Sequence, residues 1–325
     1  MKIGLIDIDG HNFPNLVLMK ISAWHKARGD DVEWCFPLDR YDVVYQSKVF
    51  DETYSPDIEW IPQADKIIKG GTGYVRRRKE KYISWLEYFV DGKWIHQDEY
   101  RGAEIYLEYF IEDITPDYSI YPELTKDTAY GFLTRGCPNA CGFCIVSDKE
   151  GRKSIKVSDL SVFWSGQKNI TLLDPNILAC REHPNLLQQL IDSKACVDFN
   201  QGLDIRLTNE RNIDLLNRIK VKEIHFAWDN AKDDLKPLFE RYKEIAKHKP
   251  HGRYGTVYCL TNFESSMEEN LYRIYTLRDL GYDPYVMIYD KPNAPREIRL
   301  LQRWCNNRKL FRSCPRFEDY DPKKA

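Results

Sequence analysis

Short apolar runs alternate with segments of helical periodicity along the chain, most regularly after residue 130. Six of these runs have the length and composition of buried strands; they cover residues 130–134, 169–173, 196–200, 223–228, 256–260 and 285–289. The apolar spacing between them predicts helices at about 156–165, 183–193, 209–218, 231–247 and 266–280, and another from residue 295. Six strand–helix units in succession predict a parallel sheet that curves toward a barrel without completing the eight units of a closed one.

The first 125 residues show the same alternation with fewer units. A strand is predicted over residues 1–9 and a helix over 15–26, and apolar runs follow at 43–45 and 66–68. This order is typical of an open α/β sheet of the Rossmann-like kind.

An aromatic and basic stretch at about 75–112 interrupts this pattern and reads as an insertion, with a hairpin around Asp91-Gly92. We expect the insertion to serve as a lid or as a connection between two domains. The predicted boundaries are therefore 1–125 for the first domain, 126–292 for the second, and 293–325 for a helical basic extension.

Composition narrows the class of protein. The chain has 325 residues with a formal net charge of −2, so overall charge gives no case for nucleic-acid binding. Its apolar runs are shorter than the ~18 residues of a membrane span, and its first residues do not resemble a secretory signal. Nine cysteines, three of them within residues 137–144, are typical of metal binding in a reducing compartment. We expect a cytoplasmic protein.

The three clustered cysteines, Cys137, Cys141 and Cys144, have the spacing C-x3-C-x2-C. Three thiolates can hold three irons of a cubane cluster and leave the fourth iron open, whereas four would saturate it. A structural zinc or iron–sulfur knuckle that borrows a distant cysteine, such as Cys180 or Cys314, is the alternative. Zinc sites usually pair two short spacings, and no second C-x2-C occurs in the chain.

With Phe143 at the aromatic position, the motif resembles the signature of the radical S-adenosylmethionine superfamily, C-x3-C-x-aromatic-C. The preceding Arg135-Gly136 is similar to the flank found in that superfamily, and the resemblance extends over about residues 130–289. It implies a partial (β/α)6 barrel, a [4Fe–4S] cluster, and S-adenosylmethionine that is cleaved reductively to a 5′-deoxyadenosyl radical. It also implies an external electron donor of the flavodoxin or ferredoxin type.

The resemblance also implies cofactor contacts at the carboxyl ends of the strands. Many members carry Gly-Gly-Glu after the second barrel strand to hold the amino group of the cofactor. This chain has Leu173-Asp174-Pro175-Asn176 there, which makes Asp174 and Asn176 the corresponding candidates. Candidates after the later strands, for the ribose and carboxylate among other contacts, are Gln201, Asp204, Arg206, Asp229 and Asn262. Residues that would act on the substrate are not indicated.

The first 125 residues are similar to the cobalamin-binding domain that often precedes this barrel. The matching positions are Asp9-Gly10-His11, Ser47-Lys48-Val49 and Gly70-Gly71, but Pro14 and Val49 replace the glycine and leucine of that pattern. We expect a degenerate relative that keeps the fold and does not retain cobalamin through His11.

The basic tail contains Cys305 and Cys314, which could join Cys180 in an auxiliary cluster. Lone cysteines are more often small buried hydrophobes, and we expect a solvated, charged last helix. Contact with RNA through Trp304, Phe311 and the tail arginines is the alternative.

Three functions remain open. The first is a radical S-adenosylmethionine enzyme that acts on an unknown substrate. The second is a methylthiotransferase-like modifier of tRNA, although such enzymes usually have three more cysteines in a first domain that here contains only Cys35. The third is a non-catalytic iron–sulfur or zinc protein that binds nucleic acid. The sequence does not indicate an oligomeric state.

Overall fold

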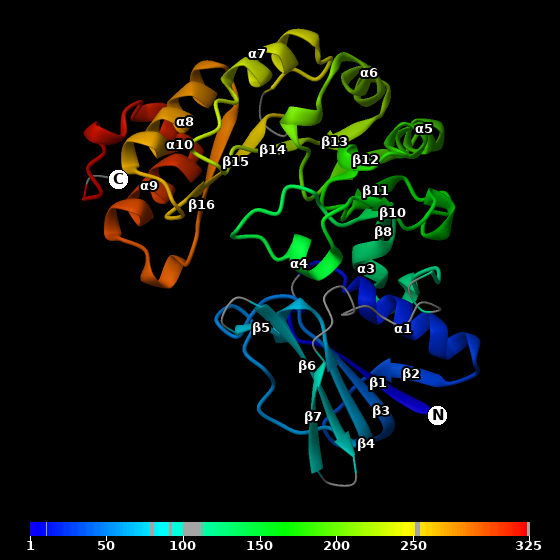
Figure 1. The fold of residues 1–325 in the computed structure, drawn as a ribbon. Helices are drawn as coiled ribbons and strands as arrows, with labels where there is room; N and C mark the ends of the chain where they lie inside the picture. The colour runs from blue at the N-terminus through cyan, green and yellow to red at the C-terminus, as the bar shows by residue number, and fades with distance from the viewer. Residues whose placement is uncertain are drawn as a thin grey trace.

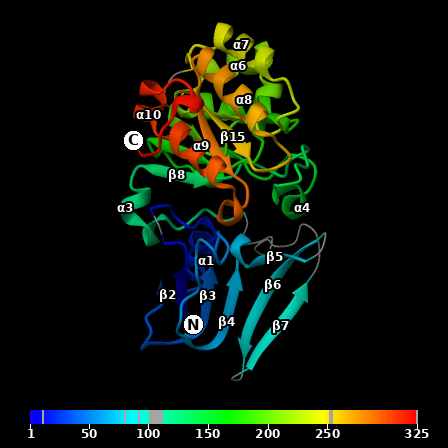
Figure 2. The same ribbon diagram turned by 90° about the vertical axis from the view of Figure 1, so that its left-hand side faces the viewer.

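The computed structural model describes residues 1–10, 12–78, 81–90, 93–99, 111, 113–250 and 254–323, with the backbone alone over 75–99. The fold is mixed α/β with parallel sheets, as the sequence predicts. One sheet with α1 belongs to the N-terminal half, and the later strands form an arc with helices on its outer side (Figures 1 and 2).

The N-terminal sheet has the strand order β2-β1-β3-β4-β6-β5, and β7 pairs with β6. Its first four strands are parallel: β1 (Lys2–Asp7), β2 (Asp31–Trp34), β3 (Arg40–Ser47) and β4 (Gln63–Gly70). Helix α1 (Leu16–Ala27) begins after Asn15, whose side chain accepts a hydrogen bond from the Leu18 amide and so caps the helix. Leu18 and Ile21 of α1 pack on Ile3 and Leu5 of β1.

Antiparallel strands extend this sheet where the sequence predicts an insertion. They are β5 (Val75–Arg78), β6 (Lys81–Val90) and β7 (Lys93–Glu99), and β6 pairs with β4. The register Val90↔Lys93 confirms the strands of the predicted hairpin, whose turn at 91–92 lies outside the described residues. Most of residues 100–112 also lie outside the described residues. The expected role of the insertion, as a lid or as a connection between two domains, therefore stays a prediction.

The C-terminal half contains two parallel sheets. The first has the order β13-β12-β11-β8 and the second β14-β15-β16. Only Ile224 separates β13 from β14 along the chain. Strand β13 pairs with β12 of the first sheet, and β14 pairs with β15 of the second. The strands are β8 (Thr128–Gly131), β11 (Asn169–Leu172), β12 (Cys196–Phe199), β13 (Val221–Glu223), β14 (His225–Ala227), β15 (Thr256–Thr261) and β16 (Asp283–Ile288).

Amphipathic helices follow these strands and cover the outer side of the arc (Figure 1). Val197 and Val257 of the strands and Leu186 and Phe239 of the helices share one buried core. Asn209 and Ser266 are confirmed as N-caps, and Ser266 forms a capping box with Glu269. The helices are α5 (His183–Ser193), α6 (Glu210–Arg218), α7 (Lys236–Ile245), α8 (Met267–Asp279), α9 (Arg296–Asn306) and α10 (Arg308–Ser313).

The prediction of a helix over residues 156–165 is wrong. Lys156 belongs to a short strand, and only a 3-10 turn, Leu160–Val162, follows. The Leu160 amide donates to the side chain of Gln189, and the Ser158 hydroxyl donates to the Phe132 carbonyl, so tertiary contacts replace helical hydrogen bonds. The apolar spacing is explained instead by burial of Leu160 and Phe163 in the core.

The basic extension is packed rather than simply solvated. Leu301, Trp304 and Phe311 form a separate buried cluster with Ile274 of α8 and Val286 of β16. Cys305 belongs to this cluster, whereas Cys180 lies in the main core. Cys314 packs against the same cluster as Cys305, so among the proposed auxiliary cysteines it is Cys180 that lies apart from the other two.

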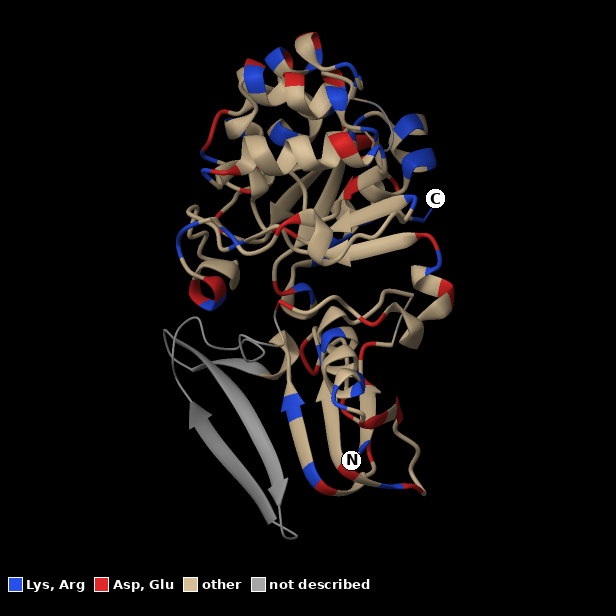
Figure 3. Cartoon of the chain, turned by 90° about the vertical axis from the view of Figure 1, so that its right-hand side faces the viewer, with Lys and Arg blue, Asp and Glu red and all other residues tan. Residues whose placement is uncertain are grey.

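Charge is mixed over the helices of the C-terminal half, where Lys and Arg alternate with Asp and Glu (Figure 3). No helix within the described residues combines the length and apolar character that crossing a bilayer requires.

Candidate functional site

The cysteine loop leaves the sheet just after β8 and returns through two short elements. Strand β9 (Thr134–Arg135) precedes the loop, helix α4 (Val146–Glu150) follows it, and β10 (Ile155–Lys156) pairs antiparallel with β9. Parallel sheets place their working loops at the carboxyl ends of the strands. The loop after β8 is in that position.

Polar contacts fasten the two ends of this loop together. Arg135 Nη1 lies 3.0 Å from Glu150 Oε1, and the Gly136 amide donates to Glu150 Oε2 at 3.1 Å. The Cys137 amide donates to the Gly151 carbonyl at 3.1 Å. Because both Arg135 and Glu150 are largely shielded from solvent, salt screens the attraction between them less than it would in an exposed pair.

Gly136 is required at the start of the loop. Its φ of +81° lies in the left-handed region, and an added Cβ would stand 2.2 Å from the Lys153 carbonyl oxygen. Any other residue would push β9 away from the segment after α4.

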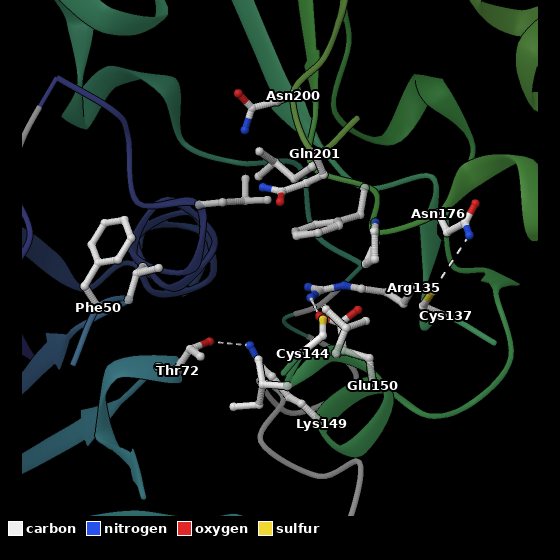
Figure 4. Close-up of a pocket in the computed structure, with 18 of the residues that line it drawn as sticks. Phe50, Thr72, Arg135, Cys137, Cys144, Lys149, Glu150, Asn176, Asn200 and Gln201 are labelled. Atoms are coloured by element: carbon white, nitrogen blue, oxygen red, sulfur yellow. Dashed lines mark hydrogen bonds and ion pairs between the residues drawn. The ribbon is translucent and has the colours of Figure 1, made fainter. Parts of the chain in front are cut away.

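A cavity of about 1380 Å³ lies between the two halves of the molecule, and Cys137, Cys141 and Cys144 all line it. Figure 4 shows Cys137 and Cys144 on the wall from the C-terminal half, with Phe50 and Thr72 on the wall from the N-terminal half. Within the described part of the chain, no three His, Cys, Asp or Glu side chains are gathered closely enough to hold a metal ion. The three thiols thus share a wall without forming a closed site.

The chemistry of this donor set fits an iron–sulfur cluster better than a hard cation, because thiolates are soft ligands. Burial raises the pKa of the Cys144 thiol and that of Cys141, and the neighbouring thiols raise both further. Phe143, between these two cysteines, meets Phe263 edge to face with 5.5 Å between ring centroids.

A chain of polar contacts runs from Cys137 across the cavity wall. Asn176 Nδ2 lies 3.7 Å from Cys137 Sγ and 3.4 Å from Asp204 Oδ2. Asp204 also accepts a two-point contact from Arg206, at 2.8 and 2.9 Å. Asn176 Oδ1 is buried and has no hydrogen-bond partner within the described residues. The structure thus brings Asn176, Asp204 and Arg206 together beside one cysteine, with an acceptor still to be satisfied.

Asp229 lies on the same wall, after β14. Its Oδ1 accepts a hydrogen bond from the Leu260 amide at 3.1 Å, and burial raises the pKa of its carboxyl to about 6. Below it, the wholly buried Arg273 of α8 donates to the carbonyls of Trp228, Asp229 and Leu260. Arg273, which the sequence analysis missed, therefore fixes the carboxyl ends of β14 and β15.

Asp174 does not line the cavity, although Leu173 and Pro175 on either side of it do, and its contact with the cofactor stays a prediction. Its buried carboxylate accepts hydrogen bonds from the amides of Leu133 and Thr134 and from the Thr134 hydroxyl, at 2.6–3.1 Å. Burial raises the pKa of Asp174 to about 6 in spite of these donors. The residue ties the end of β11 to the backbone that leads into the cysteine loop.

Asp174→Ala is accordingly expected to lower stability rather than cofactor affinity alone. Two buried amides and one hydroxyl would lose their acceptor, a loss of about 2–4 kcal/mol in the free energy of unfolding. Urea unfolding of the metal-free protein measures this effect, with the exposed Asp148→Ala in α4 as the matched control. Unchanged stability with weaker binding of S-adenosylmethionine would restore the original assignment.

The remaining candidates divide between the cavity and its surroundings. Gln201 lines the cavity next to Asn200 (Figure 4). Asn262 does not line it, since its amide donates to the Tyr289 carbonyl at 2.8 Å; the residues that follow, Phe263 and Glu264, line it instead. The backbone of this turn is left-handed at Asn262, with a φ of +63°, and at Glu264, with a φ of +47°, and the sequence alone does not reveal it.

The N-terminal half supplies the opposite wall, which the sequence analysis did not predict. Lys149 of α4 donates to the Thr72 hydroxyl at 2.6 Å and joins the cysteine loop to the N-terminal sheet. Asp7 and Asn15, at the end of β1 and the start of α1, also line the cavity.

Two positions of the cobalamin-like pattern are used within the protein itself. The Ser47 hydroxyl accepts a hydrogen bond from Asn15 at 2.9 Å. A Cβ at Gly71 would lie 2.4 Å from the Lys48 carbonyl oxygen, so this glycine serves close packing of its own backbone. His11 lies outside the described residues.

Comparison with known proteins identifies a similar fold. The solved structure of the radical S-adenosylmethionine methyltransferase TsrM from Kitasatospora setae, with cobalamin and a [4Fe–4S] cluster bound, has a TM-score of 0.62. The match covers 88% of this chain and 74% of that one at 11% sequence identity, which establishes likeness of fold alone. No protein-family model and no curated protein sequence matches this chain.

Proposed function

We propose that this protein is a radical S-adenosylmethionine enzyme acting on a substrate still to be identified. One observation carries the proposal: three cysteines with the spacing C-x3-C-x2-C lie on one closed loop after the first strand of the parallel sheets and face a shared cavity. The fold likeness to TsrM supports it. In this proposal the two parallel sheets make up the partial (β/α)6 barrel of residues 126–292, preceded by the domain of 1–125 and followed by the extension of 293–325.

Cys137, Cys141 and Cys144 would hold a [4Fe–4S] cluster with one open iron. When bound, the cluster supplies the electron that cleaves S-adenosylmethionine into methionine and a 5′-deoxyadenosyl radical. The chain's own residues bind and orient the cofactor. Asn176 presents a buried amide oxygen without a partner, which suits a donor such as an ammonium group.

Asp204 and Arg206 would face the polar end of the cofactor as a preformed pair. Since Asp204 engages Nε and Nη2 of Arg206 and Asp233 lies 3.8 Å from Nη1, a carboxylate of the cofactor would displace Asp233 from the remaining guanidinium edge. Asp229 and Gln201 complete the polar wall, and Phe143 and Phe263 offer an apolar one.

Cobalamin is not part of the proposal, because Pro14 and Val49 replace the glycine and leucine of the cobalamin-binding pattern. No specific observation favours a methylthiotransferase, which would need more cysteines than Cys35 in the first domain. We also propose that the protein works in the reducing cytoplasm, where cysteine thiols stay reduced.

Anaerobic reconstitution tests the cluster directly. The protein is expected to take up about four irons per chain, and addition of S-adenosylmethionine should change the electron paramagnetic resonance spectrum of the reduced cluster because an iron remains open to the cofactor. Cys305→Ser/Cys314→Ser is the matched control, since these thiols lie apart from the cavity, and it should bind the same iron. Tight zinc binding without iron uptake would instead support a non-catalytic knuckle.

A further inference from the structure

A smaller pocket of about 400 Å³ opens on another side of the cysteine loop. Pro138 lines it, whereas the neighbouring Cys137 and Asn139 line the large cavity, so the loop is the partition between the two. The rest of the lining comes from the segment after α4 and from the turn before α5: Arg152, Lys153, Ser154, Ile155, Lys156, Ala179, Arg181 and Glu182.

Positive charge dominates this small pocket. Arg152, Lys153 and Arg181 are exposed and form no ion pair with any residue that the structure describes. Lys156 is paired with Asp159 at 2.6 Å, and Glu182 is the single acid in the lining. This excess occurs on a chain whose net charge is −2, so it is a local feature of the loop's surroundings.

An apolar centre completes the surface. Ile155 is 53% exposed, although it belongs to strand β10, and Pro138 beside the first cysteine is exposed as well. Exposed apolar residues ringed by charge are typical of transient protein interfaces.

The pocket is connected to the thiol of Cys137 by two short routes. Pro138 is bonded to Cys137 through the peptide link. The Ser154 hydroxyl donates to the Asn176 carbonyl at 2.9 Å, and the Asn176 amide nitrogen lies 3.7 Å from Cys137 Sγ. A redox partner in this pocket would therefore stand next to the cysteine loop without entering the cavity.

We propose that this basic pocket docks the acidic protein that reduces the site, a donor of the flavodoxin class. The inference rests on the proposed function, and it adds where the reductant binds. In the step itself the donor would lose one electron and the [4Fe–4S] cluster that the three cysteines are proposed to hold would gain it, and no bond forms to either protein. A nucleic acid fits the pocket less well, because no aromatic side chain lines it to stack on a base.

Charge reversal of Arg152, Lys153 and Arg181 tests the docking. For Arg152→Glu/Lys153→Glu/Arg181→Glu, binding of a bacterial flavodoxin to the iron-free protein, followed by fluorescence anisotropy at low salt, should weaken at least about tenfold. Flavodoxin-driven cleavage of S-adenosylmethionine should fall by a similar factor, while cleavage driven by dithionite stays within about twofold. The matched control, Arg299→Glu/Arg308→Glu/Lys309→Glu, reverses exposed charges on α9 and α10 and should bind flavodoxin like the wild type.

The outcomes separate this proposal from the one on which it rests. If the wild type does not cleave S-adenosylmethionine with dithionite, the proposed function is overturned, and flavodoxin binding still decides the docking. Equal flavodoxin affinity in the triple variant and the wild type would overturn the docking. So would a variant that loses binding of transfer RNA while it keeps its affinity for flavodoxin.

Discussion

Cys141→Ala is expected to abolish reductive cleavage of S-adenosylmethionine. With dithionite as reductant, the reconstituted wild type should form 5′-deoxyadenosine and methionine slowly even without substrate, because this cleavage needs only the reduced cluster and the bound cofactor. Removal of one of three thiolates leaves the cubane with too few protein ligands. Product formation, measured by liquid chromatography, should fall below detection, and bound iron should fall with it.

The control for Cys141→Ala is Cys196→Ala, which removes a half-buried thiol of β12 that does not line the cavity. It should keep both iron and cleavage. Cleavage that survives in Cys141→Ala would overturn the proposed function.

Arg273→Leu is expected to produce the largest loss of stability. The guanidinium is wholly buried and donates to three backbone carbonyls at the ends of β14 and β15 and to Asn270 Oδ1. Burial lowers the pKa of Arg273, which shows that its charge is held at a cost. Removing one member of such a buried network typically costs ~3–5 kcal/mol, or roughly 10 °C in melting temperature for a protein of this size.

Differential scanning fluorimetry of the metal-free protein measures the change in Arg273→Leu. The matched control is Arg299→Leu on α9, where the arginine is exposed and the change should be within about 1 °C. Equal melting temperatures for the two variants would show that the carbonyls find other donors.

The parallel strands and the cysteine loop could be predicted because their signals are local. The runs at 169–173 and 196–200 match β11 and β12 to within one residue, and the helix predicted over 183–193 is confirmed as α5. Each depends on apolar periodicity that is read within one window of sequence. The helix predicted over 156–165 failed because contacts with Phe132 and Gln189, far along the chain, decided its backbone.

The direction of individual polar side chains was harder to predict. Asp174 follows β11 at the position expected for a cofactor contact, yet its two neighbours Leu173 and Pro175 line the cavity and Asp174 does not. Side chains alternate between the two faces of an extended segment, so adjacent residues at a strand end have opposite roles. The position of a segment after a strand predicts that it contributes to the cavity wall. The backbone conformation decides which of its side chains face the cavity.

Arg273 did leave a signal in the sequence. It stands with Asn270, Ile274 and Leu277 at the i, i+3, i+4 and i+7 positions of α8, the face that a helix buries. A charged residue on that face predicts a buried partner, although the carbonyls that accept its hydrogen bonds are 13 or more residues away and could not be named.

The contact between Arg135 and Glu150 across the cysteine loop would separate folding from binding of the proposed cluster. Bringing the ends of a flexible loop together lowers the entropy of the chain. Here the Arg135–Glu150 ion pair and the Cys137–Gly151 hydrogen bond offset this loss when the polypeptide folds. Small zinc modules differ, because their chain stays unfolded until the metal binds and holds its ligands together. In this protein the chain's own contacts close the loop, so the proposed cluster would be delivered to a folded acceptor rather than to a nascent coil.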